Sequence, residues 1–170
     1  MPLRRRLAAA LVAALAAMGA MPAAAQAPER NAVLLSYGPD LGRSGGRSSW
    51  REAQVTAEIR SGRAFLGPLR PVYSLSVSRQ GAVLGGVGLL ASLPLGAAEL
   101  TPSFSVALWQ DGHGGFDARA LIQFRTGIDL LVPVTQNASV GLGIFHVSNA
   151  GLTRRSADLD VVRLAVQWRY

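Results

Sequence analysis

Two long segments near the end of the chain alternate apolar with polar or small residues. In residues 117–132 the even positions are apolar apart from Thr126, whereas the odd positions carry four charges. Residues 160–170 repeat the pattern, with valine, leucine and tryptophan on one face and arginine and glutamine on the other. A period of two residues predicts β-strands, because successive side chains point to opposite faces. The segment 117–132 is longer than the usual strand of a soluble sheet.

Six further segments complete a set of eight expected strands. They cover residues 32–37, 52–59, 69–78, 82–91, 100–109 and 138–150. Segments rich in Gly, Pro, Asn and Asp lie between them and predict turns. Eight strands is the smallest common size of a membrane β-barrel.

The first 27 residues have the layout of a secretory signal peptide. Arg4, Arg5 and Arg6 precede an apolar Leu/Ala stretch that ends at Ala25-Gln26-Ala27, a small-residue cleavage site. A retained membrane-anchoring helix is the alternative interpretation. Cleavage leaves residues 28–170 as one domain and lowers the formal charge from +7 to +4.

The composition narrows the fold class further. The chain is 49% hydrophobic and has no cysteine, so disulfides cannot stabilise the exported domain. Residues 28–170 contain no apolar run of about 18 residues, which a transmembrane helix requires. We therefore predict an all-β fold, an eight-stranded antiparallel transmembrane β-barrel in the bacterial outer membrane. A soluble periplasmic lipid-binding barrel, with the two faces inverted, is an alternative, and export argues against a nucleic-acid partner.

Candidate chemistry lies in the segment 138–150. Its even positions are bulky and apolar but continue into His146 and Ser148, while its odd positions include two glycines. We expect the even face to contact lipid. A hairpin that turns near residue 153 would place Asp160 opposite His146 or close to it, at the extracellular end. Ionisable groups on a lipid-facing surface are costly, which favours a functional role over ordinary strand-end residues at the headgroup level.

These side chains suit ester hydrolysis. Ser148 needs a base within hydrogen-bonding reach, and His146 is the nearest one. Asp160 would orient the imidazole and stabilise its protonated form, with Asp158 as the alternative acid. Asn149 or a nearby backbone N–H would hold the oxyanion. The substrate of such an esterase must be a lipid that is reached from within the bilayer.

The motif His-x-Ser-Asn-Ala-Gly-Leu at residues 146–152 resembles the lipid A 3-O-deacylase family, the acyloxyacyl hydrolase-like esterases of the outer membrane. Members remove the 3-hydroxyacyl chain ester-linked at position 3 of lipid A with a Ser–His–acid triad on the lipid-facing wall. The resemblance implies that Ser148 is the nucleophile and His146 the base, and that Asn149 belongs to the oxyanion site. Asp160, twelve residues after the serine, would be the acid. The resemblance is close over the last third of the chain and extends to the rest only as a strand pattern.

Two features depart from the family pattern. The family acid is glutamate, so the side chain of Asp160 is shorter by one C–C bond, roughly 1.5 Å. The loop before it, Thr-Arg-Arg-Ser-Ala-Asp-Leu, has neither Gly nor Pro, and Ser156 stands where some members carry a second oxyanion asparagine. We expect Asp160 to serve if the hairpin brings it nearer to His146. A non-catalytic barrel with a structural or surface-interaction role is the alternative function.

The remaining charged residues fall into two groups. Arg154 and Arg155 lie in the expected outer loop, either as a solvated pair or as contacts to the phosphates of lipid A in lipopolysaccharide. The second group is expected to form an ion-pair network that fills the barrel and leaves no pore; it comprises Arg119, Arg125, Asp129, Arg163 and Arg169. His113 is interpreted as an exposed loop residue, since too few ligands lie near it for a metal site. No cofactor is indicated.

Overall fold

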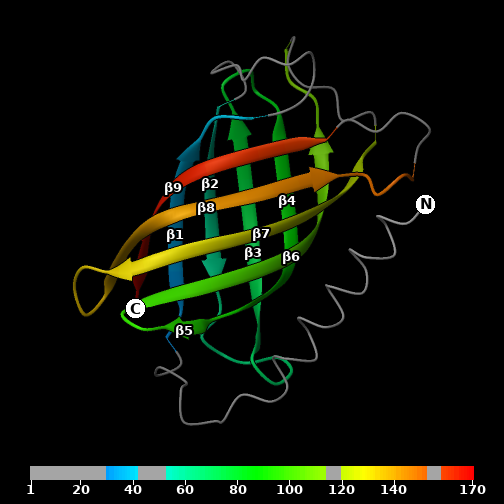
Figure 1. The fold of residues 1–170 in the computed structure, drawn as a ribbon. Helices are drawn as coiled ribbons and strands as arrows, with labels where there is room; N and C mark the ends of the chain where they lie inside the picture. Colours follow the sequence, from blue (N-terminus) through cyan, green and yellow to red (C-terminus); the bar gives the residue numbers. More distant parts are fainter. Residues whose placement is uncertain (1–29, 42–52, 114–119, 153–157) are drawn as a thin grey trace, which may run out of the picture.

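The computed structural model describes residues 30–41, 53–113, 120–152 and 158–170. The expected signal peptide at 1–27 lies outside the described residues, as do Arg119, Arg154, Arg155 and Ser156. The strands, drawn in Figure 1, are β1 (Ala32–Gly38), β2 (Gln54–Arg60), β3 (Leu69–Ser78), β4 (Val83–Ala91), β5 (Leu93–Leu95), β6 (Ala98–Gln110), β7 (Ile122–Pro133), β8 (Ala138–Ser148) and β9 (Leu159–Arg169).

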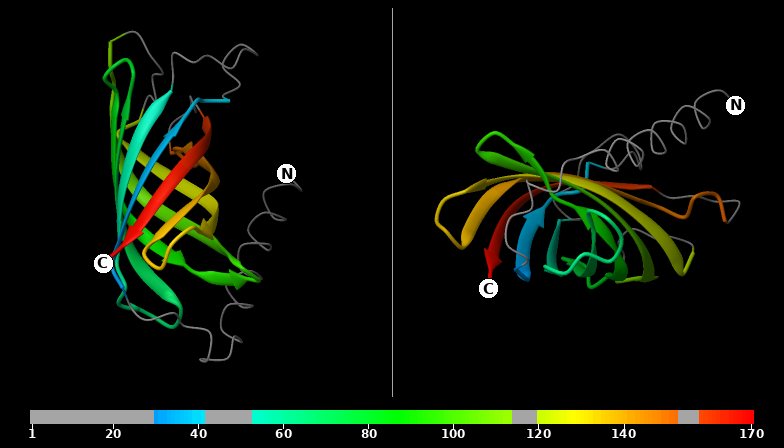
Figure 2. Two further views of the ribbon diagram at one scale, coloured as in Figure 1. Left: turned by 90° about the vertical axis from the view of Figure 1, so that its left-hand side faces the viewer. Right: turned by 90° about the horizontal axis from the view of Figure 1, so that it is seen from below.

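The strands form a closed antiparallel barrel. Sequence neighbours pair around the sheet, β1 pairs with β9, and β4 pairs with β6 to close the ring. The short strand β5 continues β4 beyond Ser92 and pairs with the first residues of β6. The predicted eight-stranded barrel is therefore confirmed, with β5 as an unpredicted extension of one strand. The strands are strongly tilted relative to one another (Figure 2).

The two ends of the barrel differ in their connections. The start of β1 and the C-terminus lie at the same end (Figure 1), where the Tyr170 N–H donates to the Asn31 carbonyl oxygen at 2.9 Å. The connections at this end, such as the one between β7 and β8, are shorter than those at the other end, between β1 and β2 and between β6 and β7. Short turns are periplasmic and long loops extracellular in outer-membrane barrels. The start of β1 and the C-terminus therefore mark the periplasmic end.

The outer surface of the barrel is apolar. Leu35, Leu142 and Leu164 are 56%, 57% and 66% exposed, and the outward positions of the other long strands are mostly apolar too. An apolar surface of this extent is suited to lipid. The predicted assignment of the even faces of 138–150 and 160–170 to the outside is confirmed, and the even positions of β7, which alternation alone fits to lipid or to a core, also point outward. A soluble lipid-binding barrel would need the opposite arrangement. No helix among the described residues is long and apolar enough to cross a membrane.

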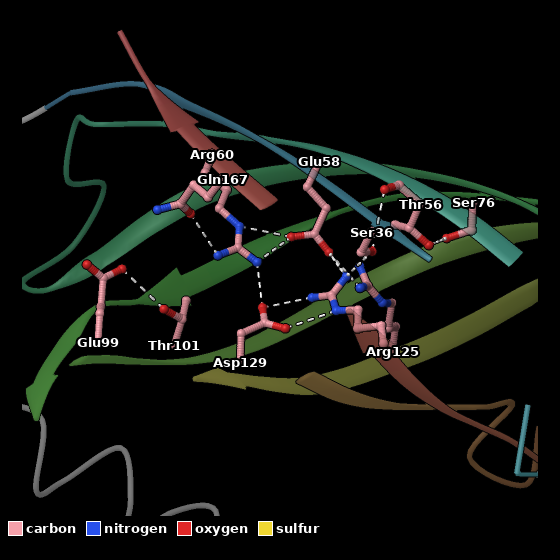
Figure 3. A network of polar contacts seen from close by, with 11 residues as sticks. Ser36, Thr56, Glu58, Arg60, Ser76, Glu99, Thr101, Arg125, Asp129 and Gln167 are labelled. Carbon is pink, nitrogen blue, oxygen red and sulfur yellow. Dashed lines mark hydrogen bonds and ion pairs between the residues drawn. The ribbon is translucent and has the colours of Figure 1, made fainter. Parts of the chain in front are cut away.

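The interior contains two different packed layers. Toward the extracellular end, eight buried apolar side chains pack together: Ala82, Leu84, Ala107, Trp109, Phe145, Val147, Leu159 and Val161. Below them lies a buried network of ion pairs (Figure 3). Glu58 accepts hydrogen bonds from Arg60, Arg125 and Arg163, and Asp129 accepts from Arg60 and Arg163.

This network confirms part of the predicted interior charge cluster. Arg125, Asp129 and Arg163 belong to it as expected, while Glu58 and Arg60 of β2 were not predicted as members. Arg169 was placed wrongly in the same network, because it pairs with Glu99 nearer the periplasmic end. The guanidinium groups of Arg125 and Arg163 also lie 4.2 Å and 5.3 Å from the ring centroid of Phe145, which links the two layers.

Candidate active site

His146 and Asp160 are in contact on the outer wall of the barrel. The antiparallel register of β8 and β9 places the two residues directly opposite each other. The distance from His146 Nδ1 to Asp160 Oδ1 is 2.7 Å, and the side chains are 42% and 41% exposed. Directly opposed residues have the closest Cβ atoms across an antiparallel pair. The short aspartate side chain therefore reaches the imidazole without an extra methylene group.

The segment that follows β1 holds Asp160 in place. The Leu41 N–H donates to the Asp160 carbonyl oxygen at 2.6 Å, and the Asp160 N–H donates to Asp40 Oδ1 at 3.2 Å. Asp40 is buried and forms a β-bridge with Val161. Both backbone polar groups of Asp160 are thus bonded to a segment that is distant in sequence. Sequence reasoning missed Asp40, since no local pattern indicates this pairing.

Ser148 is the last residue of β8 and shares the outward face with His146. It is half-buried and lies opposite Phe124 of β7. Among the described residues, its hydroxyl has no hydrogen-bond partner. Because a carboxylate occupies His146 Nδ1, the proton of the neutral imidazole belongs on Nδ1, and Nε2 is left as the basic nitrogen. Within the described part of the chain, the geometry therefore offers an unpaired hydroxyl and an unpaired basic nitrogen two residues apart on one strand.

Thr126 adds a polar group that sequence reasoning did not assign to the site. It is exposed on β7 directly opposite His146, on the side away from Asp160. A polar row thus crosses three neighbouring strands on a wall that is otherwise apolar. The signal was present in the sequence, because Thr126 is the polar exception on the apolar face of residues 117–132.

The chain turns sharply immediately after Ser148. Ala150 and Gly151 have positive φ angles of 50° and 80°, and the Leu152 N–H donates to the Asn149 carbonyl oxygen at 3.0 Å. These are the features of a type I′ turn, in which a non-glycine residue such as Ala150 is strained. The turn ends β8 two residues earlier than the expected strand 138–150.

The turn also determines which groups can contact an oxyanion. Asn149 is fully buried, and its Oδ1 accepts the Gly151 N–H at 2.9 Å. The Asn149 side chain therefore stabilises the turn from the inside and has no surface exposed on the outer wall. Ala150 is exposed, and its backbone N–H has no hydrogen-bond partner within the described part of the chain, so this N–H is the candidate donor to an oxyanion.

The apolar layer of the interior supports the site from behind. Phe145 and Val147 flank His146 along β8, and Leu159 and Val161 flank Asp160 along β9. All four are at most 2% exposed and belong to the same packed cluster. A site on two packed, paired strands is held more rigidly than one on loops. The distance between the imidazole and the carboxylate is therefore a property of the barrel wall.

The other predicted site residues are separate from this pair. Asp158 is exposed and precedes the start of β9, so the carboxylate in contact with the imidazole is that of Asp160. His113 lies in the β6–β7 connection, where its N–H donates to the Gln80 carbonyl oxygen at 2.8 Å. Among the described residues, no cluster of three or more His, Cys, Asp or Glu side chains could hold a metal ion.

Comparisons with known proteins identify the fold. No protein-family model matches the sequence, and no curated protein matches it significantly. Similar solved structures include the outer-membrane enzyme PagL, with a TM-score of 0.56 and 13% identity over 82% of this chain and 99% of that one. The N-terminal β-barrel domain of Pseudomonas aeruginosa OprF has a TM-score of 0.58 and 11% identity over 82% of this chain and 97% of that one. A de novo designed transmembrane β-barrel has a TM-score of 0.57 and 14% identity over 85% of this chain and 98% of that one.

The chain therefore has the fold of the small outer-membrane β-barrels. This fold, together with the apolar outer surface, places it in the bacterial outer membrane. At such low identities the similarity extends to the fold alone, and the neighbours include an enzyme as well as designed barrels. Function must be argued from the site.

Proposed function

We propose that the chain is a lipid A 3-O-deacylase, a serine esterase that hydrolyses the ester-linked 3-hydroxyacyl chain of lipid A in the outer leaflet. The observation that carries the proposal is the 2.7 Å contact between His146 and Asp160 on the outer wall, beside Ser148. Ionisable side chains on a lipid-facing surface oppose insertion and mark functional sites. The resemblance of residues 146–152 to the deacylase motif and the presence of the enzyme PagL among the fold neighbours support the same reading.

In the proposed reaction Ser148 attacks the acyl carbonyl carbon of the 3-O ester and His146 Nε2 takes the hydroxyl proton. Asp160 stabilises the imidazolium that forms. The Ala150 N–H donates to the oxyanion of the tetrahedral intermediate, and Asn149, whose Oδ1 accepts the Gly151 N–H, holds the turn that presents this N–H. The bond between the acyl carbon and the 3-oxygen of the sugar then breaks, and His146 gives the proton to that leaving oxygen. Water, activated by the same imidazole, hydrolyses the acyl-enzyme and releases the 3-hydroxy fatty acid.

The position of the site fits a membrane substrate. The imidazole, the carboxylate and the serine lie on the outer wall near the extracellular end, so an acyl ester reaches them by lateral diffusion within the outer leaflet. Lipid A, the membrane anchor of lipopolysaccharide, is the expected partner there. Arg154 and Arg155 are proposed to bind its phosphates, and replacement of both by alanine should lower activity on phosphorylated lipid A. Unchanged activity in that variant would remove them from the site.

A non-catalytic barrel with a structural or surface-interaction role is the second candidate. The observation in its favour is that the Ser148 hydroxyl makes no hydrogen bond to His146 among the described residues. In enzymes without bound substrate, however, catalytic hydrogen bonds are often long and tighten only when substrate binds.

The deciding experiment is mass spectrometry of lipid A from an outer-membrane host that expresses the chain. The expected result is the loss of one 3-hydroxyacyl group, abolished by Ser148→Ala and retained in Ser103→Ala, the same change on β6, two strands away from β8. Asp160→Asn should lower the rate about 10³- to 10⁴-fold, and Asp158→Asn should leave it unchanged. Each variant is shown to be folded by its heat-modifiable migration on gels. Intact lipid A with the folded wild-type barrel would establish the non-catalytic alternative.

A further inference from the structure

A second concave site lies at the opposite end of the barrel. The lumen there contains a cavity of about 550 Å³, lined by residues from the periplasmic ends of the strands and from the turns that join them. This volume falls within the range of small-molecule sites. The cavity is separated from the proposed esterase site by the length of β8 and lies inside the barrel, so it is independent of that proposal.

Four arginines line one side of this cavity. Arg169 belongs to β9, Arg30 lies two residues before β1, Arg60 ends β2 and Arg70 lies at the start of β3. The strands β9, β1, β2 and β3 are consecutive neighbours in the sheet, so the four residues form a continuous arc. We call this set the arginine arc. Among the described residues that line the cavity, Glu99 is the one acid.

The arginines of the arc differ in how far they are neutralised. Arg60 donates to Glu58, Asp129 and Gln167, which uses most of its donors. Arg169 donates to Glu99 and Ser139, two contacts for five N–H groups.

The other two arginines have no carboxylate partner among the described residues. Arg30 donates to the neutral amide oxygen of Asn137 at 2.8 Å. Arg70 makes no ion pair or side-chain hydrogen bond with any described residue. The cavity therefore faces two guanidinium groups without a counter-ion from the described part of the chain.

The cavity is closed toward the extracellular side. Arg60 lies both in its wall and in the buried ion-pair network with Glu58 and Asp129, and the packed apolar layer lies beyond that network. An anion can therefore enter from the periplasmic end and cannot pass through. Low-dielectric walls around charges of one sign focus the electrostatic potential and concentrate counter-ions.

We propose that the arginine arc is a binding site for a small phosphate-bearing molecule that enters from the periplasm. The guanidinium group matches phosphate oxygens in a bidentate geometry, and several such groups on adjacent strands suit an anion of more than one charge. Two sources supply this chemistry, a soluble phosphate compound and the headgroup of a glycerophospholipid in the inner leaflet.

The test is calorimetric titration of the folded full-length barrel in a zwitterionic detergent. Inorganic pyrophosphate represents the soluble source and dihexanoyl phosphatidylglycerol the lipid source. We expect saturable binding of at least one of them, and the one that binds identifies the source. Arg70→Gln should weaken it at least about tenfold, the loss of one charge-assisted contact. Arg30→Gln serves as a second variant if Arg70→Gln does not fold.

The matched control is Arg79→Gln, which removes the same charge from the exposed turn at the other end of β3. It should leave the affinity unchanged. Absence of saturable binding by both probes would overturn the proposal. An equal loss of affinity in Arg79→Gln and Arg70→Gln would overturn it too, because binding would then reflect net charge and not the arc.

Discussion

Replacement of Glu58 by glutamine is expected to destabilise the barrel strongly. The Glu58 carboxylate is 2% exposed and lies at the centre of the ion-pair network. It accepts from Arg60 Nε at 2.9 Å and from a terminal guanidinium nitrogen of Arg60, Arg125 and Arg163 at 2.6 Å each. Glutamine keeps the shape of the side chain but places an amide NH₂ among these donors.

The magnitude follows from the charges that are left behind. The wild-type network contains three guanidinium groups and two carboxylates, and the variant retains only the carboxylate of Asp129. Breaking a buried ion pair by removing one partner costs about 3–5 kcal/mol, because the other charge remains buried and uncompensated. We therefore expect Glu58→Gln to lower the free energy of unfolding by about 3–5 kcal/mol.

A second substitution should recover part of this loss. Arg125 bonds to Glu58 alone among the carboxylates of the network, and its Nε has no hydrogen-bond partner among the described residues. Arg125→Met in the Glu58→Gln background removes the cation that has lost its carboxylate and places an apolar side chain beside Phe145. The double variant should lose at least about 1 kcal/mol less free energy of unfolding than the two single variants lose together, since contacting residues couple by this amount.

The assay is urea unfolding in phospholipid vesicles, followed by tryptophan fluorescence and heat-modifiable migration. The control is Glu99→Gln. Glu99 is 23% exposed, its one ion pair among the described residues is with Arg169, and it accepts a longer hydrogen bond from Thr101, so loss of its charge should cost at most about 1 kcal/mol. The reasoning is refuted if the free energy of unfolding of Glu58→Gln lies within about 1 kcal/mol of the wild-type value. It is refuted equally if the effects of Glu58→Gln and Arg125→Met are additive.

Two further substitutions test the close packing of the wall and the support of the candidate site. Gly143→Ala would put a Cβ against Asp129 Oδ1 and should destabilise the barrel by roughly 1–3 kcal/mol in the same assay, whereas Gly85→Ala, whose Cβ meets nothing within 4 Å, should be close to neutral. Asp40→Ala removes the acceptor for the Asp160 N–H and should lower kcat of the proposed deacylation about tenfold with KM unchanged. Asp40→Asn keeps an acceptor oxygen and should retain the wild-type rate. Equal activity of the wild type and both variants would exclude a positioning role for Asp40.

Much of the fold could be predicted from alternation alone. The outer face of a membrane barrel must be apolar throughout, so a period of two residues identifies both the strand and the side that contacts lipid. The strand β5 escaped prediction, because it is only three residues long, contains Pro94, and depends on pairing with β6. Glu58, the carboxylate that Arg125 and Arg163 share, was not predicted for a similar reason. Glu58 lies more than sixty residues away in sequence, and only the closed ring brings it opposite them.

The candidate site was predictable where it depends on one strand and less so where it depends on two. His146 and Ser148 share a face because they are two residues apart on β8, which the sequence shows directly. The choice between Asp160 and Asp158 depends on the register of β8 against β9, and a shift of two residues along β9 would exchange them. The buried position of Asn149 depends on the turn at Ala150, whose positive φ is unusual for alanine.

The contact between the polar groups on the outer wall, and not either group alone, indicates a function. A polar side chain near the end of a barrel strand costs little, about 0–1 kcal/mol, so His146 or Asp160 alone would be an ordinary feature of the headgroup region. Their contact requires two strands to place complementary groups at one level, and a segment after β1 to hold that level through Asp40. A barrel selected only to span a membrane has no use for this arrangement, because lipid solvates apolar side chains at the same positions without it. The supported pair, with Ser148 beside it, is therefore the feature that favours an enzyme over a purely structural barrel.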